Sequence, residues 1–189
     1  MANGGSLRLW RDFFPRGIIA GVDVNRSARL EDPRIRVYQG SQEDTAFLDL
    51  VASQVAPGGF DVIIDDCSHI GSLTEVSFWH LFRRHLKPGG IYVIEDWGTG
   101  YWEKWPDGAA YRPQGPSRRS ALFVRVPPRL KPIVASVMGS QHLRSHDAGM
   151  VGFVKRLVDE CGRPDYAGGA PSAIAHLDVR TSLVTVHKA

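Results

Sequence analysis

Short apolar runs alternate with longer amphipathic stretches along the chain. The short runs are rich in β-branched residues and end at polar or turn-forming positions, so each predicts a buried strand. Six such strands are predicted, at residues 18–24, 34–38, 60–64, 91–94, 176–180 and 183–187. The last two follow each other closely and predict a pair of strands at the C-terminal end of the sheet.

The stretches between these runs carry apolar residues at helical spacing. Leu7, Trp10 and Phe14 share one helix face, and similar faces are predicted over 46–55, 73–86 and 151–161. The sequence Lys-Pro-Gly-Gly at 87–90 is expected to end the helix over 73–86, and Gly162 to cap the helix over 151–161. Strands separated by helices predict an α/β fold with a doubly wound, mostly parallel sheet and an antiparallel C-terminal strand.

One segment, 103–147, does not follow this alternation of predicted strands and helices. It contains six prolines, and eight basic residues against three acidic ones. Long loops inside a compact domain usually carry function or are disordered. We therefore expect residues 1–189 to form one domain, with a lid or substrate insertion at 103–147.

Composition places the chain among soluble globular proteins. Of its 189 residues, 43% are hydrophobic and 23% are charged. No apolar run approaches the ~18 residues of a membrane span, and no signal peptide is recognised. Cys67 and Cys161 are too few for a disulfide framework, so a reducing, cytoplasmic location is expected. The net charge of +3 is too small to indicate a nucleic-acid partner.

Acidic residues follow two of the predicted buried strands. Asp65 and Asp66 come at the end of one, and Glu95 and Asp96 at the end of the next. If these strands are neighbours, they lie ~4.8 Å apart and four carboxylates meet at one edge of the sheet. Carboxylates held together repel and raise each other's pKa, which a divalent cation such as Mg²⁺ would relieve.

Two further features lie beside this acidic edge. His69 is three residues beyond Asp66, where a neutral imidazole could act as a general base. The alternative for His69 is a loop histidine that bonds a backbone carbonyl. Tyr101 and Trp102 follow Asp96 and could stack on a sugar ring. Packing of a lid onto the domain explains these two aromatic residues equally well.

The N-terminal segment carries features of a nucleoside-cofactor site. Gly4 and Gly5 precede a predicted helix, where they allow close backbone approach and where the helix N-terminus favours a negative group. Asp23, at the end of the first predicted strand, could accept the hydroxyls of a ribose. No G-x-G-x-x-G turn follows a strand, which argues against a dinucleotide oxidoreductase.

Taken together, four segments resemble the class I S-adenosylmethionine-dependent methyltransferases. They are GGSLRLWRDFFPRG at 4–17, GVDVN at 21–25, FDVIIDDCSH at 60–69 and KPGGIYVIEDWGTGYW at 87–102. The subgroup that they resemble is the metal-dependent sugar O-methyltransferases of macrolide biosynthesis. The similarity spans roughly residues 4–102 and is weaker in the C-terminal strands.

The resemblance implies methyl transfer from S-adenosylmethionine to a hydroxyl of a sugar or glycosylated natural product, with Mg²⁺ or another divalent cation. It assigns metal binding to Asp66, Glu95 and Asp96, and the catalytic base to His69. Cofactor contacts are implied for Gly4, Gly5, Asp23 and Asp65. The partner expected from it is a small hydroxyl-bearing molecule, with Tyr101 and Trp102 as substrate contacts.

Two departures from the family pattern stand out. The family usually has glycine where Cys67 stands, and its first strand precedes the glycine turn, where only residues 1–3 remain here. That strand would lie between those at 18–24 and 60–64, and its loss would leave backbone groups unpaired. A shortened reading frame, a strand from another subunit and a degenerate relative all remain open, and the gap favours a homo-oligomer. The alternative function is a cofactor-binding or interaction module without catalysis.

Overall fold

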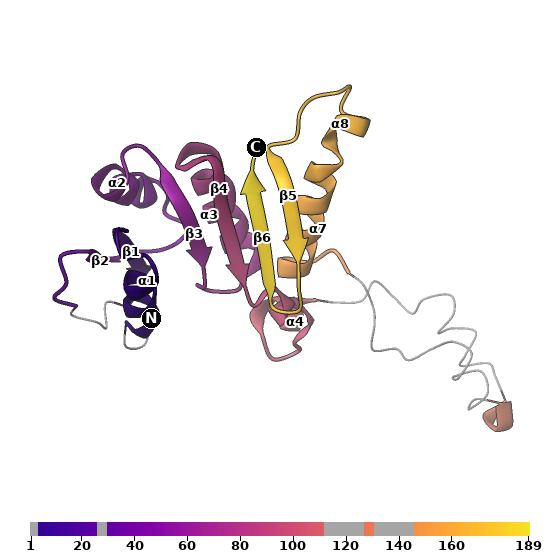
Figure 1. Ribbon diagram of the computed structural model, residues 1–189. Helices are drawn as coiled ribbons and strands as arrows, with labels where there is room; N and C mark the ends of the chain where they lie inside the picture. The colour runs from indigo at the N-terminus through magenta and orange to yellow at the C-terminus, as the bar shows by residue number, and fades with distance from the viewer. Residues whose placement is uncertain (1–3, 26–29, 112–126, 131–145) are drawn as a thin grey trace.

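The computed structural model describes residues 4–25, 30–111, 127–130 and 146–189 (Figure 1). The strands are β1 (Ile19–Asp23), β2 (Ile35–Gln39), β3 (Phe60–Asp65), β4 (Leu86–Glu95), β5 (Ile174–Val179) and β6 (Leu183–Lys188). The α-helices are α1 (Gly5–Phe13), α2 (Thr45–Val55), α3 (Gly71–Arg84), α4 (Pro106–Ala110), α7 (Gly149–Cys161) and α8 (Arg163–Tyr166). Two 3₁₀ helices complete them, η1 (Trp97–Tyr101) and η2 (Pro128–Leu130). Within these ranges, every helix is too short or too polar to cross a membrane.

The strands form two sheets (Figure 1). Strands β1 and β2 pair in parallel, and the larger sheet has the order β3-β4-β6-β5. In the larger sheet β3 and β4 are parallel, whereas β6 runs antiparallel to both β4 and β5. These pairings confirm the predicted α/β class with an antiparallel C-terminal strand.

The position expected for a missing strand falls between the two sheets. In the part of the chain that the structure describes, β1 pairs only with β2, and β3 pairs only with β4. Residues of both β1 and β3 line one cleft, from Ile19 to Val22 on one side and from Phe60 to Asp65 on the other. The division of the sheet at this point agrees with the prediction from the sequence.

One sequence prediction about β4 is wrong. The stretch 87–90 does not serve as the stop between a helix and a later strand, because α3 ends at Arg84 and these residues lie inside β4. Leu86 pairs with Phe60 and Ile91 pairs with Val62, so β4 bulges between these pairs. Gly89 has a φ of 73°, a left-handed conformation that glycine adopts without steric cost. The bulge therefore absorbs the turn-forming residues without ending the strand.

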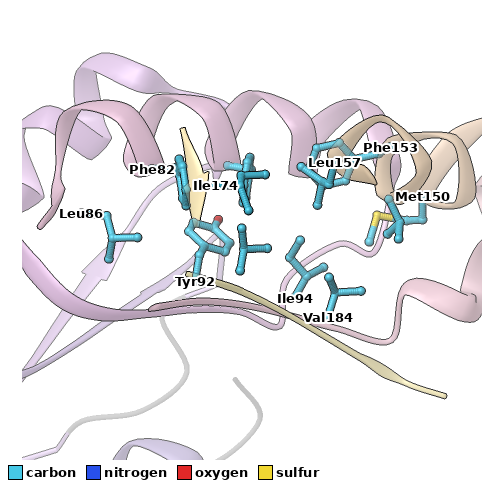
Figure 2. Packing of buried hydrophobic residues seen from close by; sticks show 12 residues of the cluster. Phe82, Leu86, Tyr92, Ile94, Met150, Phe153, Leu157, Ile174 and Val184 are labelled. Carbon is cyan, nitrogen blue, oxygen red and sulfur yellow. The ribbon is translucent and has the colours of Figure 1, made fainter. Parts of the chain in front are cut away.

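The main hydrophobic core lies between the larger sheet and helices α3 and α7, which cover one of its faces (Figure 2). Tyr92 and Ile94 alternate along β4 and both point into this core. Phe78 and Phe82 of α3 stack with their ring centroids 4.9 Å apart. The sheet and α3 thereby become one rigid platform for the loops at the carboxyl ends of β3 and β4.

A single carboxylate joins the N-termini of α3 and α7. Asp107 Oδ2 accepts the backbone N–H of Gly71 at 2.8 Å and that of Met150 at 2.7 Å. Both N–H groups lie in the first turn of a helix, where no intrahelical partner exists and a negative charge is favoured. A Cβ at Gly71 would lie 2.2 Å from the carbonyl carbon of Gly149, so glycine is needed for this close approach.

We predict that Asp107→Ala destabilises the protein by about 2 kcal/mol, since two helix caps of about 1 kcal/mol each are lost. Urea denaturation followed by circular dichroism measures this change. Asp178→Ala is the matched control, because Asp178 pairs with Arg180 at the surface and such pairs contribute less than about 1 kcal/mol. Equal effects of the two substitutions would contradict the capping role.

Candidate functional site

The carboxyl ends of β3 and β4 bring the predicted acidic residues together. Asp65 pairs with Ile94, so Asp66 leaves β3 beside the point where Glu95 ends β4. The ligand atoms of Asp66, His69 and Asp96 all lie within 4.8 Å of one another. His69 Nε2 is 3.6 Å from Asp66 Oδ1. Of the four carboxylates that the sequence predicts at this edge, Asp66 and Asp96 lie in this group, together with His69.

Two residues of this group have left-handed backbones. The φ angles of His69 and Asp96 are 51° and 50°, a region that costs a non-glycine residue about 1 kcal/mol or more. The His69 carbonyl accepts hydrogen bonds from Thr99 Oγ1 and Trp105 Nε1, both at 3.2 Å. These hydrogen bonds help to offset the cost of the left-handed backbone at His69. Strain held in this way is typical of functional sites.

The Asp96 backbone is fixed by the chain that leads into the neighbouring strand β6. Its N–H donates to the carbonyl of Ser182 at 2.7 Å, in the turn that leads into β6. Its own carbonyl accepts the N–H of Thr99 at 3.0 Å, which begins η1. The sequence did not reveal that Thr99, Trp105 and Ser182 support this site, because nothing local in the sequence marks a residue that supports a distant loop.

Glu95 lies beside this group but does not belong to the set of ligand atoms within 4.8 Å. Desolvation raises the pKa of Glu95, and the negative charges of Asp66 and Asp96 raise it further. Three carboxylates therefore lie close together at this edge. Among the described residues, no lysine or arginine lowers the pKa of Glu95. Carboxylate oxygens with one imidazole nitrogen are donors that could hold a divalent cation here.

Asp65, unlike Asp66, is buried and bonded to the protein. Its Oδ2 accepts the Ser77 hydroxyl at 3.1 Å and the Tyr92 hydroxyl at 3.2 Å. Burial raises the pKa of Asp65. The side chain also lies at the wall of the cleft. Its contact with a cofactor stays a prediction, whereas its role in tying β3 to α3 and β4 is evident.

The acidic edge opens into the cleft between the two sheets. The cleft has a volume of about 850 Å³ and is lined from β1, β3, β4, α1, α2 and α3. Apolar side chains from the helices, such as Trp10 and Val51, form much of its wall. Asp66, Cys67 and Glu95 lie at its polar end. A ligand in this cleft would therefore have an apolar surface on its sides and carboxylates at one end.

The predicted cofactor residues near the N-terminus lie at the margin of the cleft. Gly4 is the N-cap of α1 with a φ of 65°, and Gly5 is the first residue of that helix. Asp23 ends β1, and its Oδ1 accepts the N–H of Asn25 at 2.8 Å. Their neighbours Ser6 and Val22 line the cleft. Cofactor binding by Gly4, Gly5 and Asp23 stays a prediction.

The predicted substrate residues are exposed beside the acidic edge. Tyr101 ends η1 and Trp102 follows it, with 49% and 57% of their surfaces exposed. The Tyr101 ring lies 5.1 Å from that of the buried His146, centroid to centroid. Most of the predicted lid, at 112–126 and 131–145, lies outside the described residues. The lid and both substrate contacts therefore stay predictions.

Cys67 has the properties of a structural residue. The residue is exposed as a whole, but desolvation of its thiol and the charge of Asp65 raise the pKa to about 12. A thiol with that pKa remains protonated near neutral pH and is a poor nucleophile. The Cys67 thiol is therefore not a candidate nucleophile.

No family model matches the chain. It is 50% identical over 99 residues to mycinamicin VI 2''-O-methyltransferase of Micromonospora griseorubida, covering 52% of this chain and 24% of that protein. Demethylmacrocin O-methyltransferase of Streptomyces fradiae is 46% identical over 99 residues, with the same coverage of 52% and 24%. A tetracenomycin-C rhamnosyl 2'-O-methyltransferase of Streptomyces olivaceus is 44% identical over 101 residues, covering 53% and 26%.

A solved structure matches nearly the whole chain. It is the MycE methyltransferase of the mycinamycin biosynthetic pathway, in complex with Mg, SAH and mycinamycin VI. The TM-score is 0.67 at 33% identity, and the match covers 98% of this chain and 40% of that one. The sequence alignments span about a quarter of the length of the three curated relatives. The chain is thus similar in sequence to sugar O-methyltransferases of macrolide and tetracenomycin pathways, and its fold matches that of the MycE methyltransferase.

Proposed function

We propose that this protein is an S-adenosylmethionine-dependent, Mg²⁺-assisted O-methyltransferase that acts on a hydroxyl of a sugar or glycosylated natural product. The observation that carries the proposal is the convergence of Asp66, His69 and Asp96 beside the end of the cleft that Asp66 lines, with His69 and Asp96 held in strained backbone conformations. Homology to enzymes that methylate glycosylated macrolides supports the choice of acceptor class.

The donor set of this chain fits a hard divalent cation. Asp66 and Asp96 offer carboxylate oxygens within 4.8 Å of each other, and Glu95 is destabilised as an anion by both. Mg²⁺ prefers oxygen ligands and keeps several waters, so two or three carboxylates suffice. We assign its binding to Asp66, Glu95 and Asp96. When bound, Mg²⁺ would supply positive charge that favours the alkoxide form of the acceptor hydroxyl.

His69 is assigned the role of general base. Its Nε2 accepts the proton of the acceptor hydroxyl, and the imidazolium that results lies 3.6 Å from Asp66 Oδ1, whose charge stabilises it. The hydrogen bonds from Thr99 and Trp105 hold the His69 backbone so that the ring points at the acidic edge. Tyr101 and Trp102 would stack on the sugar and orient its hydroxyl.

The cofactor is assigned to the cleft. S-adenosylmethionine supplies the electrophilic methyl group. Gly4 and Gly5 at the N-terminus of α1 would receive a negatively charged part of the cofactor, and Asp23 and Asp65 would accept its hydroxyl or amino groups. The insertion at 103–147 would close over the acceptor and exclude water. We further propose a cytoplasmic protein with a small-molecule partner, no nucleic-acid partner and a tendency to form homo-oligomers.

The alternative of a binding module without catalysis is not favoured. The alternative gives the acidic edge a structural metal, whereas the relatives that the chain resembles in sequence are O-methyltransferases. Failure of S-adenosylmethionine to bind would favour the alternative, and this binding is open to direct measurement.

We predict that S-adenosylhomocysteine binds the purified protein at one saturable site per chain, because the cleft offers apolar walls and a polar end. Isothermal titration calorimetry with and without Mg²⁺ measures the stoichiometry. Absence of heat in both conditions would support the alternative of a module without catalysis.

Asp96→Asn is expected to abolish metal-dependent methyl transfer while leaving the affinity for S-adenosylhomocysteine unchanged. Asparagine tolerates the left-handed backbone of this position, so the variant should fold. Activity is measured by transfer of a labelled methyl group to a panel of glycosylated macrolides and rhamnosylated aromatic polyketides, with and without Mg²⁺. The control is Asp178→Asn on β5, which should retain activity. Full activity of the Asp96 variant would refute the metal assignment.

His69→Asn is expected to lower turnover by about 100-fold or more, the usual contribution of a general base, with Mg²⁺ binding retained. Asparagine suits the φ of 51° better than alanine, so His69→Ala serves as the companion variant that reveals any added backbone effect. Turnover and Mg²⁺ affinity are measured on the same preparations. If both variants methylate the acceptor at the normal rate, His69 is not the base.

A further inference from the structure

A second group of potential metal ligands lies at the other end of β4. Asp49 of α2 faces His80 of α3 and His85, which directly follows α3. Asp49 Oδ1 is 2.7 Å from His80 Nε2 and 2.5 Å from His85 Nε2. The ligand atoms of all three residues lie within 4.8 Å of one another. Two imidazole nitrogens therefore converge on one carboxylate oxygen.

The backbone holds this group in place. The N–H of His85 donates to the Leu81 carbonyl at 2.8 Å, and the His85 carbonyl accepts the N–H of Phe60 at 2.6 Å. His85 is thus fixed both by the end of α3 and by the start of β3. His80 lies in the last two turns of α3, whose neighbouring residues Phe78 and Phe82 are fully buried. The two imidazoles come from a rigid part of the fold.

The group is charged and accessible from one side. The side chain of Asp49 is 40% exposed, while those of His80 and His85 are 12% and 20% exposed. Hydrogen bonds from His85 and His80 hold the pKa of Asp49 below its usual range, so the carboxylate is ionised near neutral pH. Arg84 also acts on Asp49 and is the positive charge that would oppose a cation here.

We propose that Asp49, His80 and His85 bind a divalent transition metal of the Zn²⁺ class. Two imidazoles with one carboxylate suit Zn²⁺, with water as the fourth ligand, and do not suit Mg²⁺, which prefers oxygen alone. Tetrahedral Zn²⁺ holds its donor atoms about 3.3 Å apart, given bond lengths near 2.0–2.1 Å. The present contacts of 2.5 and 2.7 Å need to lengthen by less than about 1 Å.

The protonation of the two histidines allows metal–nitrogen bonds to replace their hydrogen bonds to Asp49. A neutral histidine with its proton on Nδ1 presents a lone pair at Nε2, so both rings ligate as the neutral tautomer. A proton on Nε2 that bonds Asp49 leaves that atom when a metal binds, either to Nδ1 of the same ring or to solvent.

The site would act as a cross-link between the two sheets. Helix α2 follows β2 of the small sheet, and α3 packs on the large one. A metal held by both helices would fasten one to the other. The proposal does not depend on the methyltransferase assignment, because the length of β4 separates His85 from Glu95.

Cobalt titration tests the proposal directly. The full chain, stripped with EDTA, is titrated with Co²⁺ while excess Mg²⁺ occupies the carboxylate-rich edge. We expect intense visible absorption bands typical of four-coordinate Co²⁺, saturating at one ion per chain, and their loss when Zn²⁺ is added. Asp49→Asn, His80→Gln and His85→Gln should each weaken binding by at least about tenfold. Arg84→Gln should strengthen it.

The matched control is His176→Gln. His176 and His187 form another imidazole pair, with ring centroids 5.4 Å apart compared with 5.5 Å for His80 and His85. This variant should bind Co²⁺ like the parent. Absence of the bands in the parent, or their survival in His80→Gln and His85→Gln, would overturn the proposal. If a variant fails to fold, X-ray absorption spectroscopy of the Zn²⁺-loaded parent protein tests the proposal instead. A Zn²⁺ coordination shell without imidazole nitrogen would also overturn the proposal.

Discussion

The parallel pairing of β3 with β4 is the constraint on which the site depends. It directs Asp66, Glu95 and Asp96 to the same edge of the sheet, and the buried Asp65 holds the pairing at that end through Tyr92 of β4 and Ser77 of α3. A slip of one residue would exchange the two faces of a strand. It would carry Tyr92 and Ile94 out of the core, so packing and site geometry are specified together.

The site combines two unfavourable features that need support from the surrounding structure. Carboxylates stand together at one edge, and His69 and Asp96 are held with positive φ. The hydrogen bonds to these two residues come from η1, from Trp105 and from the turn before β6. Asp107 of the following helix, α4, then joins α3 to α7. The segment after β4 is therefore part of the machinery that shapes the site as well as a candidate substrate contact.

Sequence patterns predicted the features that are local and missed those set by distant contacts. The six strands follow from apolar runs, and the acidic edge follows from where two runs end. The bulge in β4 was missed, because pairing with β3, and not the Pro-Gly-Gly sequence alone, decides whether the chain turns or continues. Asp107 is 36 residues from Gly71, and Asp49 is 36 residues from His85. No periodicity in the sequence relates residues so far apart.

The division of the sheet links ligand binding to stability. Within the ranges that the structure describes, β1 and β3 share no hydrogen bonds, and both line the cleft. The small sheet is joined to the large one through helices, notably where Asp49 of α2 meets His80 and His85. A ligand that touches both walls of the cleft therefore binds only when the two sheets are correctly placed, and it stabilises that placement by mass action. A contact that holds α2 to α3 favours the same placement of the two sheets, from the opposite end of the sheet. Cofactor affinity and the α2–α3 contact should consequently be coupled, although no residue belongs to both.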